Sequence, residues 1–454
     1  MILLLLLTLS VDSIIDQPDL QHVQVGMIVI DLAKDSVVYA RNYQRNMVPA
    51  SNVKIITSAA ALTFLGRDFR FKTGLVFRGD LQKSKFNGDL VVVGRGDPSF
   101  SLDDLEHFVT AVKDHGISVI SGDILLDDSY FTDERLPIGW AWHYLDARYA
   151  AEISALSLNR NVVNVRIEGT RPGMLADVSI EPSTRYVRLV NEMRTRMVGD
   201  SIIIFRPPEM NTIYVDGGIE QGRIRDIEVA VKDPTAFFGQ YLRERLQANG
   251  IKVDGNCVKL KGSRSSMVGA EQGLFDSVMS MPMHAIVREL NTESINLYGE
   301  AIVKTLGAYY TNVGSFRAGV SILKEFIRRC GVDTTFVALY DGSGLSRHNL
   351  LSPYAIALVL RYMYHSELFE EFSGLLPGPG EGTLENRFKG LNSVLRAKTG
   401  TLDGVSCLSG YLRLNDKDYC FSLLFNNFTC SNRKIEVIQE NILKELARAL
   451  KEEA

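Results

Sequence analysis

The sequence predicts a mixed α/β (α+β) fold in which helices flank a five-stranded antiparallel sheet and a large β-rich insertion interrupts the chain. Three observations carry this prediction: β-rich runs stand near both ends, helical tracts adjoin them, and short β-rich runs dominate residues 73–274. The chain of 454 residues is too long for one simple core, and its hydrophobic content of 46% is ordinary for a globular protein.

Residues 1–20 begin with an apolar run, Met1-Ile2-Leu3-Leu4-Leu5-Leu6-Leu7, and turn polar at Asp12. The run is too short to span a bilayer but has the length of the apolar region of a signal peptide, although a basic start and a clear cleavage site are missing. We expect residues 1–20 to be a signal or N-terminal segment that exports the protein to the periplasm or cell envelope. The alternative is a buried N-terminal strand.

Residues 21–72 open the main domain. Val25–Asp31 and Val37–Ala40 are β-rich and stand on either side of a turn-like tetrapeptide, which predicts a hairpin. After Pro49, the spacing of apolar residues predicts a helix over Ser51–Leu65, which Gly66 closes.

Residues 73–274 have a different pattern. One helix is predicted there, over Thr235–Asn249, and turn clusters separate the β-rich runs. We expect a β-rich insertion of one or two domains. Its clearest runs are Gly88–Val93, Val119–Asp127, Val162–Glu168, Tyr186–Val190 and Ser201–Phe205.

Residues 275–454 supply the remaining helices and strands. Because two N-terminal strands and three C-terminal strands complete one antiparallel sheet, we expect residues 21–72 and 275–454 to form a single domain. The predicted helices are Pro282–Thr311, Phe316–Cys330, Ser352–Tyr364 and Ser431–Lys451, and the strands are Val394–Thr401, Ser406–Leu414 and Tyr419–Asn426.

The charge balance excludes several classes of function. The chain has 50 basic and 54 acidic residues, a formal charge of -4, which argues against a nucleic-acid-binding protein. Its five cysteines form no Cys-x-x-Cys pair, so neither a zinc site nor a disulfide framework is predicted. We expect no metal and no cofactor, and the oligomeric state is left open.

A candidate nucleophile lies at the start of the first predicted helix. Ser51 and Lys54 belong to Ser51-Asn52-Val53-Lys54, directly after Pro49, a residue favoured at helix starts. Backbone N–H groups and the helix dipole favour developing negative charge there. Lys54 lies on the same helix face as Ser51 and takes the serine proton only when neutral, a state that burial and a second cation favour.

Two later motifs complete the candidate site. Ser294-Ile295-Asn296 offers a proton relay in Ser294 and an amide in Asn296 that orients a substrate. Lys398-Thr399-Gly400-Thr401 ends a predicted strand, so Lys398 and Thr399 face a substrate carboxylate, while Gly400 leads into Thr401. The backbone N–H of Thr401 pairs with that of Ser51 as an oxyanion hole in this hypothesis.

Each of these motifs also occurs elsewhere in the chain, in a poorer context. The Ser-x-x-Lys copies at Ser321 and Ser431 lie within a helix and before the terminal helix, respectively. Ser157-Leu158-Asn159 and Lys72-Thr73-Gly74 fall within or at the edge of the insertion. Position, rather than the motifs alone, therefore selects Ser51, Ser294 and Lys398.

Taken together, these motifs make the chain resemble the class C low-molecular-mass penicillin-binding proteins, which are serine D-alanyl-D-alanine carboxypeptidases and endopeptidases. The resemblance covers nearly the whole chain, and the 243 residues from Ser51 to Ser294 match the family's large insertion. Further matching tracts are Gly94-Arg95-Gly96-Asp97-Pro98, Asp127-Asp128-Ser129-Tyr130-Phe131, Asp341-Gly342-Ser343-Gly344-Leu345-Ser346 and Gly382-Thr383-Leu384.

The resemblance implies a penicillin-recognising serine transpeptidase/β-lactamase-like fold. It also implies that Ser51 is acylated, that Lys54 is its base, and that Ser294, Asn296, Lys398 and Thr399 complete the site. The implied substrates are the D-Ala-D-Ala end of a peptidoglycan stem peptide or a D-Ala-diaminopimelate cross-link, and penicillins are the implied inhibitors. Peripheral association with a membrane is compatible with this expectation.

The sequence departs from the family's pattern at two places. Ile295 replaces a residue that is often polar, and His143 and Tyr144 follow Trp140-Ala141-Trp142 where acidic residues are common in the family. The identity of the third stem-peptide residue that the site recognises is therefore not predicted.

Three alternative functions are compared with this interpretation. The sequence lacks the Gly-x-Ser-x-Gly motif of a histidine-based hydrolase, and it lacks the deacylating Glu-x-x-Leu-Asn tract of a β-lactamase. A non-hydrolytic penicillin or peptidoglycan sensor stays open.

Overall fold

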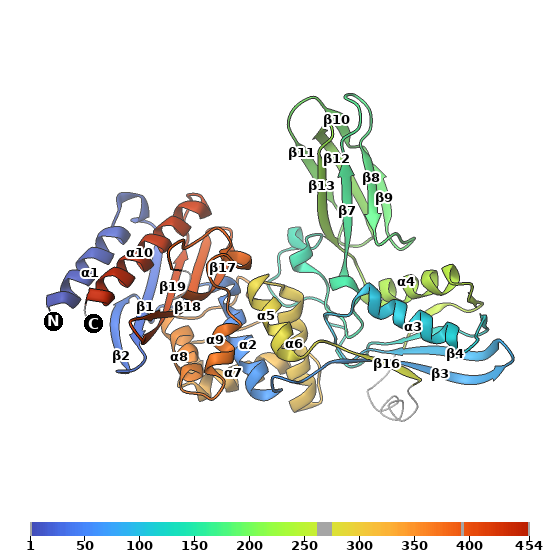
Figure 1. Cartoon of the computed structure of the whole chain (residues 1–454), viewed down its shortest axis with the longest axis horizontal. Helices are drawn as coiled ribbons and strands as arrows, with labels where there is room; N and C mark the ends of the chain where they lie inside the picture. The colour runs from blue at the N-terminus through green and yellow to red at the C-terminus, as the bar shows by residue number, and fades with distance from the viewer. Residues whose placement is uncertain (1, 261–274, 392–394, 453–454) are drawn as a thin grey trace. The chain divides into compact units, whose positions relative to one another are not determined.

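A computed structural model describes residues 2–260, 275–391 and 395–452 of the chain (Figure 1). The chain forms two compact units. Unit 1 comprises Met1–Phe69, Pro137–Gly139 and Pro282–Ala454, and unit 2 comprises Arg70–Leu136 and Trp140–Met281. The predicted insertion ran from residue 73 to residue 274. The later boundary reflects β16 (Asp276–Met279), which pairs with β3 (Lys72–Gln82) in unit 2.

Unit 1 is built on a five-stranded antiparallel sheet, as predicted, and the mixed α/β fold class is confirmed. Its strand order is β17-β18-β19-β1-β2, so strands from the two ends of the chain pair directly: Gln24 lies opposite Asn426 and Asp31 opposite Tyr419. The strands are β1 (Gln24–Asp31), β2 (Ser36–Arg41), β17 (Leu395–Leu402), β18 (Val405–Leu414) and β19 (Lys417–Asn426).

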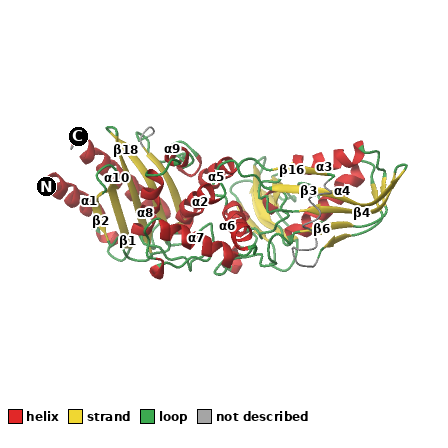
Figure 2. Ribbon diagram, turned by 90° about the horizontal axis from the view of Figure 1, so that it is seen from below, coloured by secondary structure: helices red, strands yellow, loops and turns green. Residues whose placement is uncertain are grey.

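Helices cover both faces of this sheet (Figure 2). Alternate residues of β19 explain the layering, since Phe421 and Leu423 join the core under α10 (Asn432–Glu452), whereas Cys420 contacts the backbone of α8 (Pro353–Tyr364) on the other face. The same side holds α2 (Val53–Phe64), α5 (Met283–Thr292), α6 (Asn296–Thr311), α7 (Phe316–Arg329) and α9 (Phe369–Gly374).

The predicted signal segment is largely helical in the structure. Helix α1 (Ile2–Ile15) contacts α10, and Val11 and Ile15 are buried in the same core as α10 and β19. Within residues 2–260, 275–391 and 395–452, no helix is long and apolar enough to cross a membrane.

The predicted helix Pro282–Thr311 is two helices. α5 ends at Thr292 and α6 begins at Asn296, and between them Ser294 has a left-handed backbone with φ of 57°. A non-glycine residue adopts this conformation only when its surroundings hold it there, because its Cβ is crowded. The interruption separates the Ser294 side chain from both helices and places Asn296 at the first position of α6.

Within residues 70–136, 140–260 and 275–281, unit 2 consists of a larger sheet with two α-helices and two smaller sheets. The larger sheet has the order β14-β5-β4-β3-β16, with β6 and β15 attached, and α3 (Leu102–Asp114) and α4 (Pro234–Ala248) pack against it. Its strands are β3, β4 (Lys85–Val93), β5 (Val119–Ile120), β6 (Ile124–Asp127), β14 (Lys252–Val253), β15 (Cys257–Lys259) and β16.

The smaller sheets have the orders β13-β7-β8 and β10-β12-β11, with β9 paired to β12. Their inward-facing residues, such as Val163, Val165 and Val215, join the core of unit 2. The strands are β7 (Val162–Glu168), β8 (Asp177–Glu181), β9 (Arg188–Asn191), β10 (Arg194–Arg196), β11 (Ser201–Phe205), β12 (Thr212–Glu220) and β13 (Ile224–Ala230).

Helix α3 was not predicted, although the sequence carries its start signal. The Ser101 hydroxyl accepts a hydrogen bond from the backbone N–H of Asp104, and the Asp104 carboxylate accepts one from the backbone N–H of Ser101. This capping box stabilises the first turn of the helix. The short β-rich runs on both sides obscured it.

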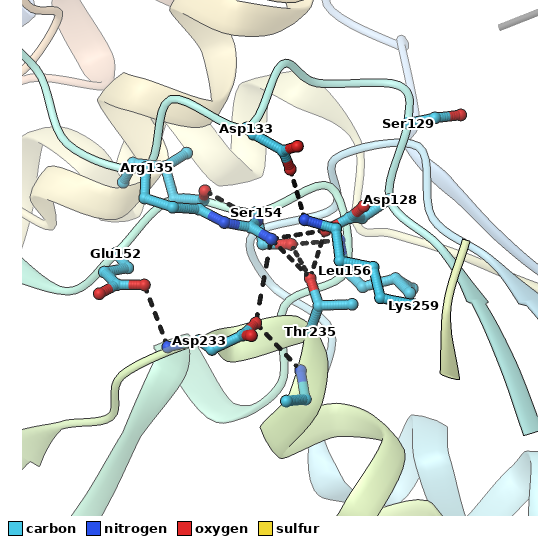
Figure 3. A network of polar contacts seen from close by, with 12 residues as sticks. Asp128, Ser129, Asp133, Arg135, Glu152, Ser154, Leu156, Asp233, Thr235 and Lys259 are labelled. Atoms are coloured by element: carbon cyan, nitrogen blue, oxygen red, sulfur yellow. Dashed lines mark hydrogen bonds and ion pairs between the residues drawn. The ribbon is translucent and has the colours of Figure 1, made fainter. Parts of the chain in front are cut away.

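A buried ion-pair network joins four segments of unit 2 (Figure 3). Asp128 accepts hydrogen bonds from Arg135 at 2.6 Å and from Thr235 at 2.5 Å, and the ammonium group of Lys259 lies 3.3 Å away. The side chain of Asp128 is 4% exposed. Because so many donors surround one buried carboxylate, the network fixes the loop after β6 against the start of α4.

Replacement of Asp128 is expected to destabilise unit 2. Asp128→Ala leaves the Arg135 guanidinium poorly paired in a mostly buried position, which lowers the free energy of unfolding by about 3 kcal/mol. Both tryptophans, Trp140 and Trp142, lie in unit 2, so urea unfolding followed by tryptophan fluorescence reports on this unit. The control is Asp133→Ala, which removes an 84% exposed partner of Lys259. It should change the free energy of unfolding by less than about 1 kcal/mol. Equal effects of the two variants would contradict the prediction.

Candidate active site

Ser51 lies in a short 3₁₀ turn, Ala50–Asn52, that leads directly into α2. The predicted helix start after Pro49 is therefore present, with a tighter first turn. Ala50 has a left-handed backbone with φ of 45°, and a Cβ on Gly344 would lie 1.8 Å from the Ala50 carbonyl oxygen. The strained turn thus depends on a glycine neighbour at Gly344.

The Lys54 side chain is fully buried beside Ser51. Its Nζ lies 2.8 Å from the Ser51 Oγ, 2.6 Å from the Asn296 Oδ1 and 2.8 Å from the Ser343 carbonyl oxygen. The last two atoms only accept hydrogen bonds. A neutral Lys54 amine therefore donates its two N–H groups to them, and its lone pair faces the Ser51 hydroxyl. Burial lowers the pKa of Lys54 to about 7, against the opposing effect of Asp341 and Glu300.

Lys398 is the second buried lysine of the site. Its Nζ donates to the Ser294 Oγ at 3.1 Å and to the Thr399 carbonyl at 3.0 Å. Burial lowers the pKa of Lys398 well below its usual value, and the nearby Lys54 lowers it further. Lys54 thus disfavours the charged form of Lys398, whereas the lowered pKa of Lys54 is due to its burial.

Strand β17 runs directly against the nucleophile. A Cβ on Gly400 would lie 2.9 Å from the Ser51 backbone nitrogen, so only glycine permits this approach. Thr399 donates a hydrogen bond to the Thr383 hydroxyl at 2.8 Å, and Thr401 is exposed at the end of the strand. The structure thus brings Ser51, Lys54, Ser294, Asn296 and the Lys398–Thr401 strand into one cluster within unit 1.

Asn52 ties the nucleophile turn to the sheet and was not singled out from the sequence. Its amide donates to the Lys398 carbonyl at 3.1 Å, and its oxygen accepts from the Ser409 hydroxyl at 2.5 Å. The side chain is fully buried. Because it bonds to both β17 and β18, Asn52 holds the Lys398 backbone beside Ser51.

A loop built on two buried carboxylates supports Lys54 from the other side. Glu300 accepts hydrogen bonds from the backbone N–H groups of Gly342 and Ser343, the latter at 2.8 Å. Asp341 accepts from the backbone of Gly344 at 2.9 Å and of Ser346 at 2.6 Å. Burial, together with the neighbouring Asp341, raises the pKa of Glu300 to about 8. This loop positions the Ser343 carbonyl oxygen, which accepts a hydrogen bond from Lys54.

Replacing Glu300 is expected to slow acylation without removing any group that touches the substrate. In Glu300→Gln, an amide NH₂ faces backbone donors, so the Ser343 carbonyl shifts away from Lys54. We expect the rate of acylation by a labelled penicillin to fall about 10- to 100-fold, as for other positioning residues. The control is Glu325→Gln on the exposed side of α7, which should react like the wild type. An unchanged rate in Glu300→Gln would contradict the role.

The motif copies elsewhere lack this setting. Ser321 is exposed and donates to the Ala318 carbonyl of its own helix at 2.6 Å, and Ser431 is exposed at the start of α10. Ser157 and Lys72 lie in unit 2. His348, the best candidate base for a histidine-based hydrolase, has its ring centroid 5.6 Å from the ring of Tyr340.

The cluster has the groups that acyl transfer requires. A hydroxyl faces a base whose pKa is close to neutral, a second hydroxyl lies beside a second lysine, and a strand end adjoins the Ser51 backbone N–H. Such a site activates a serine without histidine. Its second lysine offers N–H donors beside the second hydroxyl.

Comparison with known proteins is consistent with this geometry. Residues 7–449 match the D-Ala-D-Ala carboxypeptidase 3 (S13) family. The chain is 33% identical over 440 residues to the D-alanyl-D-alanine carboxypeptidase of an Actinomadura species, covering 92% of this chain and 80% of that protein. It is 25% identical over 405 residues to D-alanyl-D-alanine carboxypeptidase DacB of Haemophilus influenzae, covering 86% of this chain and 82% of that protein.

Solved structures share the fold. Penicillin binding protein 4 of Haemophilus influenzae superposes with a TM-score of 0.83 at 22% identity, over 96% of this chain and 99% of that chain. A predatory peptidoglycan endopeptidase of Bdellovibrio bacteriovorus superposes with a TM-score of 0.53 at 15% identity, over 94% of this chain and 93% of that chain. The predicted likeness to class C low-molecular-mass penicillin-binding proteins is confirmed. The chain belongs to the D-Ala-D-Ala carboxypeptidase 3 (S13) family.

Proposed function

We propose that the protein is a serine DD-peptidase of peptidoglycan, that unit 1 is its catalytic domain, and that Ser51 is its nucleophile. One observation supports this most strongly: the buried Lys54 Nζ lies within 2.8 Å of the Asn296 Oδ1, the Ser343 carbonyl oxygen and the Ser51 Oγ. A neutral amine that donates hydrogen bonds to the first two acceptors directs its lone pair at the Ser51 hydroxyl. That arrangement suits a general base, which must be neutral and in reach of the proton that it removes.

In the proposed reaction, Lys54 takes the Ser51 proton while the Ser51 Oγ forms a bond to the carbonyl carbon of the penultimate D-alanine. The backbone N–H groups of Ser51 and Thr401 stabilise the negative charge on the carbonyl oxygen. The amide bond then breaks, and the proton passes from Lys54 through Ser294 to the leaving amine. Water later attacks the acyl carbon while Lys54 takes its proton, and the bond between that carbon and the Ser51 Oγ breaks as Lys54 returns the proton to the Ser51 Oγ.

Substrate binding is assigned to the polar groups around this reaction centre. The Lys398 ammonium and the hydroxyl of Thr399 bind the carboxylate of the leaving residue, and the Asn296 amide orients the peptide. Gly400 keeps the strand close enough for Thr401 to complete the oxyanion hole. A leaving D-alanine gives carboxypeptidase activity, and a leaving side-chain amine of a cross-link gives endopeptidase activity.

Penicillins are the proposed inhibitors, since they present a strained amide and a carboxylate to the same groups. A Haemophilus influenzae penicillin binding protein 4 with this fold was solved in complex with a β-lactam, with a TM-score of 0.78. We place the enzyme in the periplasm or cell envelope, where peptidoglycan lies, with export directed by its N-terminal segment and peripheral contact with a membrane.

The test measures products from two defined substrates with the purified full chain. A stem pentapeptide ending in D-Ala-D-Ala should release D-alanine, a cross-linked dimer should yield monomers, or both should react. Ser51→Ala should yield neither product. If the wild type binds penicillin covalently but releases no product from either substrate, the enzyme proposal is wrong and a sensor is left.

A further inference from the structure

A short segment of unit 1, residues 377–384, lies against β17, which ends the strand order of the five-stranded sheet. We call this segment the strap. At its start, the Pro377 carbonyl oxygen accepts a hydrogen bond from the backbone N–H of Ala397 at 2.9 Å. At its end, the 3₁₀ turn Gly382–Leu384 places the fully buried side chain of Leu384 in the core that also holds α10. The strap is therefore fixed both to the sheet and to the core.

The strap brings Thr383 to the candidate active site. A Cβ on Gly382, which has φ of 44°, would lie 2.2 Å from the Thr292 carbonyl oxygen, so this close approach requires glycine. Thr292 belongs to the segment that leads into Ser294. The next strap residue, Thr383, has its hydroxyl oxygen 2.8 Å from that of Thr399. The strap thus holds Thr383 beside β17 while its preceding residue touches the segment that carries Ser294.

The hydrogen bond between the two threonines leaves a donor on Thr383. Thr399 is 9% exposed, and its hydroxyl donates to the Thr383 Oγ1. A threonine hydroxyl has one proton, so Thr383 accepts this bond and keeps its own proton. Thr383 is exposed, and its proton has no acceptor among the residues that the structure describes. Because the bond from Thr399 polarises the Thr383 O–H group, Thr383 is the stronger donor of the pair toward a ligand from solvent.

The carboxylates of this region leave room for an anionic ligand. In the strap, Glu381 accepts a hydrogen bond from Arg396 at 2.8 Å, so its charge is paired. Glu293 and Glu385 are exposed, where water and salt screen their charges. Glu293 also raises the pKa of Lys398 against the effect of burial, which favours the charged form of this lysine.

We propose that Thr383 binds substrate by donating a hydrogen bond to the carboxylate of the leaving residue. The inference rests on the proposed peptidase function and adds a residue to the carboxylate-binding group assigned there to Lys398 and Thr399. A hydroxyl that donates to a carboxylate forms a charge-assisted hydrogen bond, which is stronger than one between neutral groups. Thr383 therefore favours leaving groups with a free carboxylate, which the terminal D-alanine and the penicillins share.

The experiment compares acylation of the purified full chain by benzylpenicillin and by its methyl ester, which lacks the free carboxylate. Rates come from competition with a fluorescent penicillin. Thr383→Val keeps the shape of the side chain but removes the hydroxyl. Its acylation by benzylpenicillin should be about 10- to 100-fold slower than in the wild type, because a hydrogen bond to a charged group is lost. Its acylation by the methyl ester should stay within about twofold of the wild-type rate, which also shows that the site is folded.

Two further variants serve as controls. Thr383→Ser keeps a hydroxyl and should restore most of the rate with benzylpenicillin. Thr311→Val removes an exposed hydroxyl at the end of α6 and should react like the wild type with both compounds.

The outcomes separate this inference from the proposed function. A wild-type rate of Thr383→Val with benzylpenicillin would overturn the role of Thr383 and leave the proposed function standing. Equal slowing with both compounds would also overturn it, because Thr383 would then only hold the strap in place. Failure of the wild type to react with either compound would overturn the proposed function and this inference with it.

Discussion

Ser51→Ala is expected to abolish covalent labelling by penicillin and to lower peptidase turnover by at least about 10⁴-fold, because it removes the hydroxyl that lies 2.8 Å from Lys54, whose pKa is about 7. The small substitution keeps the strained turn at Ala50 intact, so the loss is chemical rather than structural. Labelling is measured by gel fluorescence of a tagged penicillin, and turnover by release of D-alanine.

Two other serines in the same sequence pattern serve as matched controls. Ser321→Ala and Ser431→Ala also remove the serine of a Ser-x-x-Lys motif, but Ser321 is exposed on α7 and Ser431 is exposed just before α10. Both variants should label at the wild-type rate. Labelling that survives in Ser51→Ala, or disappears in either control, would show that another residue is the nucleophile.

The members of this cluster could be predicted from the sequence because each lies in a short motif at an element boundary. Pro49 marked the start of the nucleophile helix, and the strand-rich C-terminal setting marked Lys398. The spacing of the motifs did not predict that Ser294 stands between two helices. A left-handed residue inside an otherwise helical tract has no reliable signal in residue types, since serine occurs in helices and turns alike.

The supporting residues were not predicted for a different reason. Glu300 lies in the middle of α6, and Asp341 lies in a loop, so neither has local features that distinguish it from an exposed carboxylate. Their function arises from tertiary contacts, in which both carboxylates accept backbone N–H groups of one buried loop. Asn52 is similar, because its partners lie more than three hundred residues away along the chain.

The five-stranded sheet of unit 1 could be predicted because its strands lie in two blocks near the two ends of the chain. Within these blocks apolar and polar residues alternate, or β-branched residues are frequent. Unit 2 was predicted less completely, since many of its strands are short and its helix α3 lies among them. Short strands are stabilised by long-range pairing, which a local pattern does not encode. The capping box at Ser101 and Asp104 is the local signal for α3 in this tract.

Replacement of Lys54 is expected to have the second largest effect. Lys54→Met keeps the length of the buried side chain but removes the base, so acylation by penicillin should slow by about 10³-fold. Lys54→Arg should be no faster, because the guanidinium stays charged and takes up no proton. The rates come from stopped labelling reactions at fixed penicillin concentration. Wild-type acylation in either variant would mean that another group removes the Ser51 proton.

The pH dependence of the wild type follows from the same lysine. With a pKa lowered from 10.5 to about 7, Lys54 is mainly protonated below that pH and mainly neutral above it. The acylation rate should therefore rise about tenfold per pH unit on the acid side and level off above about pH 7. In Lys54→Met the residual rate should lose this limb, and a limb that persists there would assign the pKa to a different group.

Stability supplies an independent measure of the same pKa. In the unfolded chain Lys54 keeps a proton up to its ordinary pKa of 10.5, whereas the folded protein releases it near 7. Between these values the unfolded state binds more protons, so Lys54 makes the free energy of unfolding rise with pH. Lys54→Met should reduce this rise while Lys324→Met, which alters the lysine of the Ser321 motif, should leave it unchanged. If the two variants have the same pH dependence of unfolding, Lys54 is not a neutral, buried amine, and its assignment as the base is wrong.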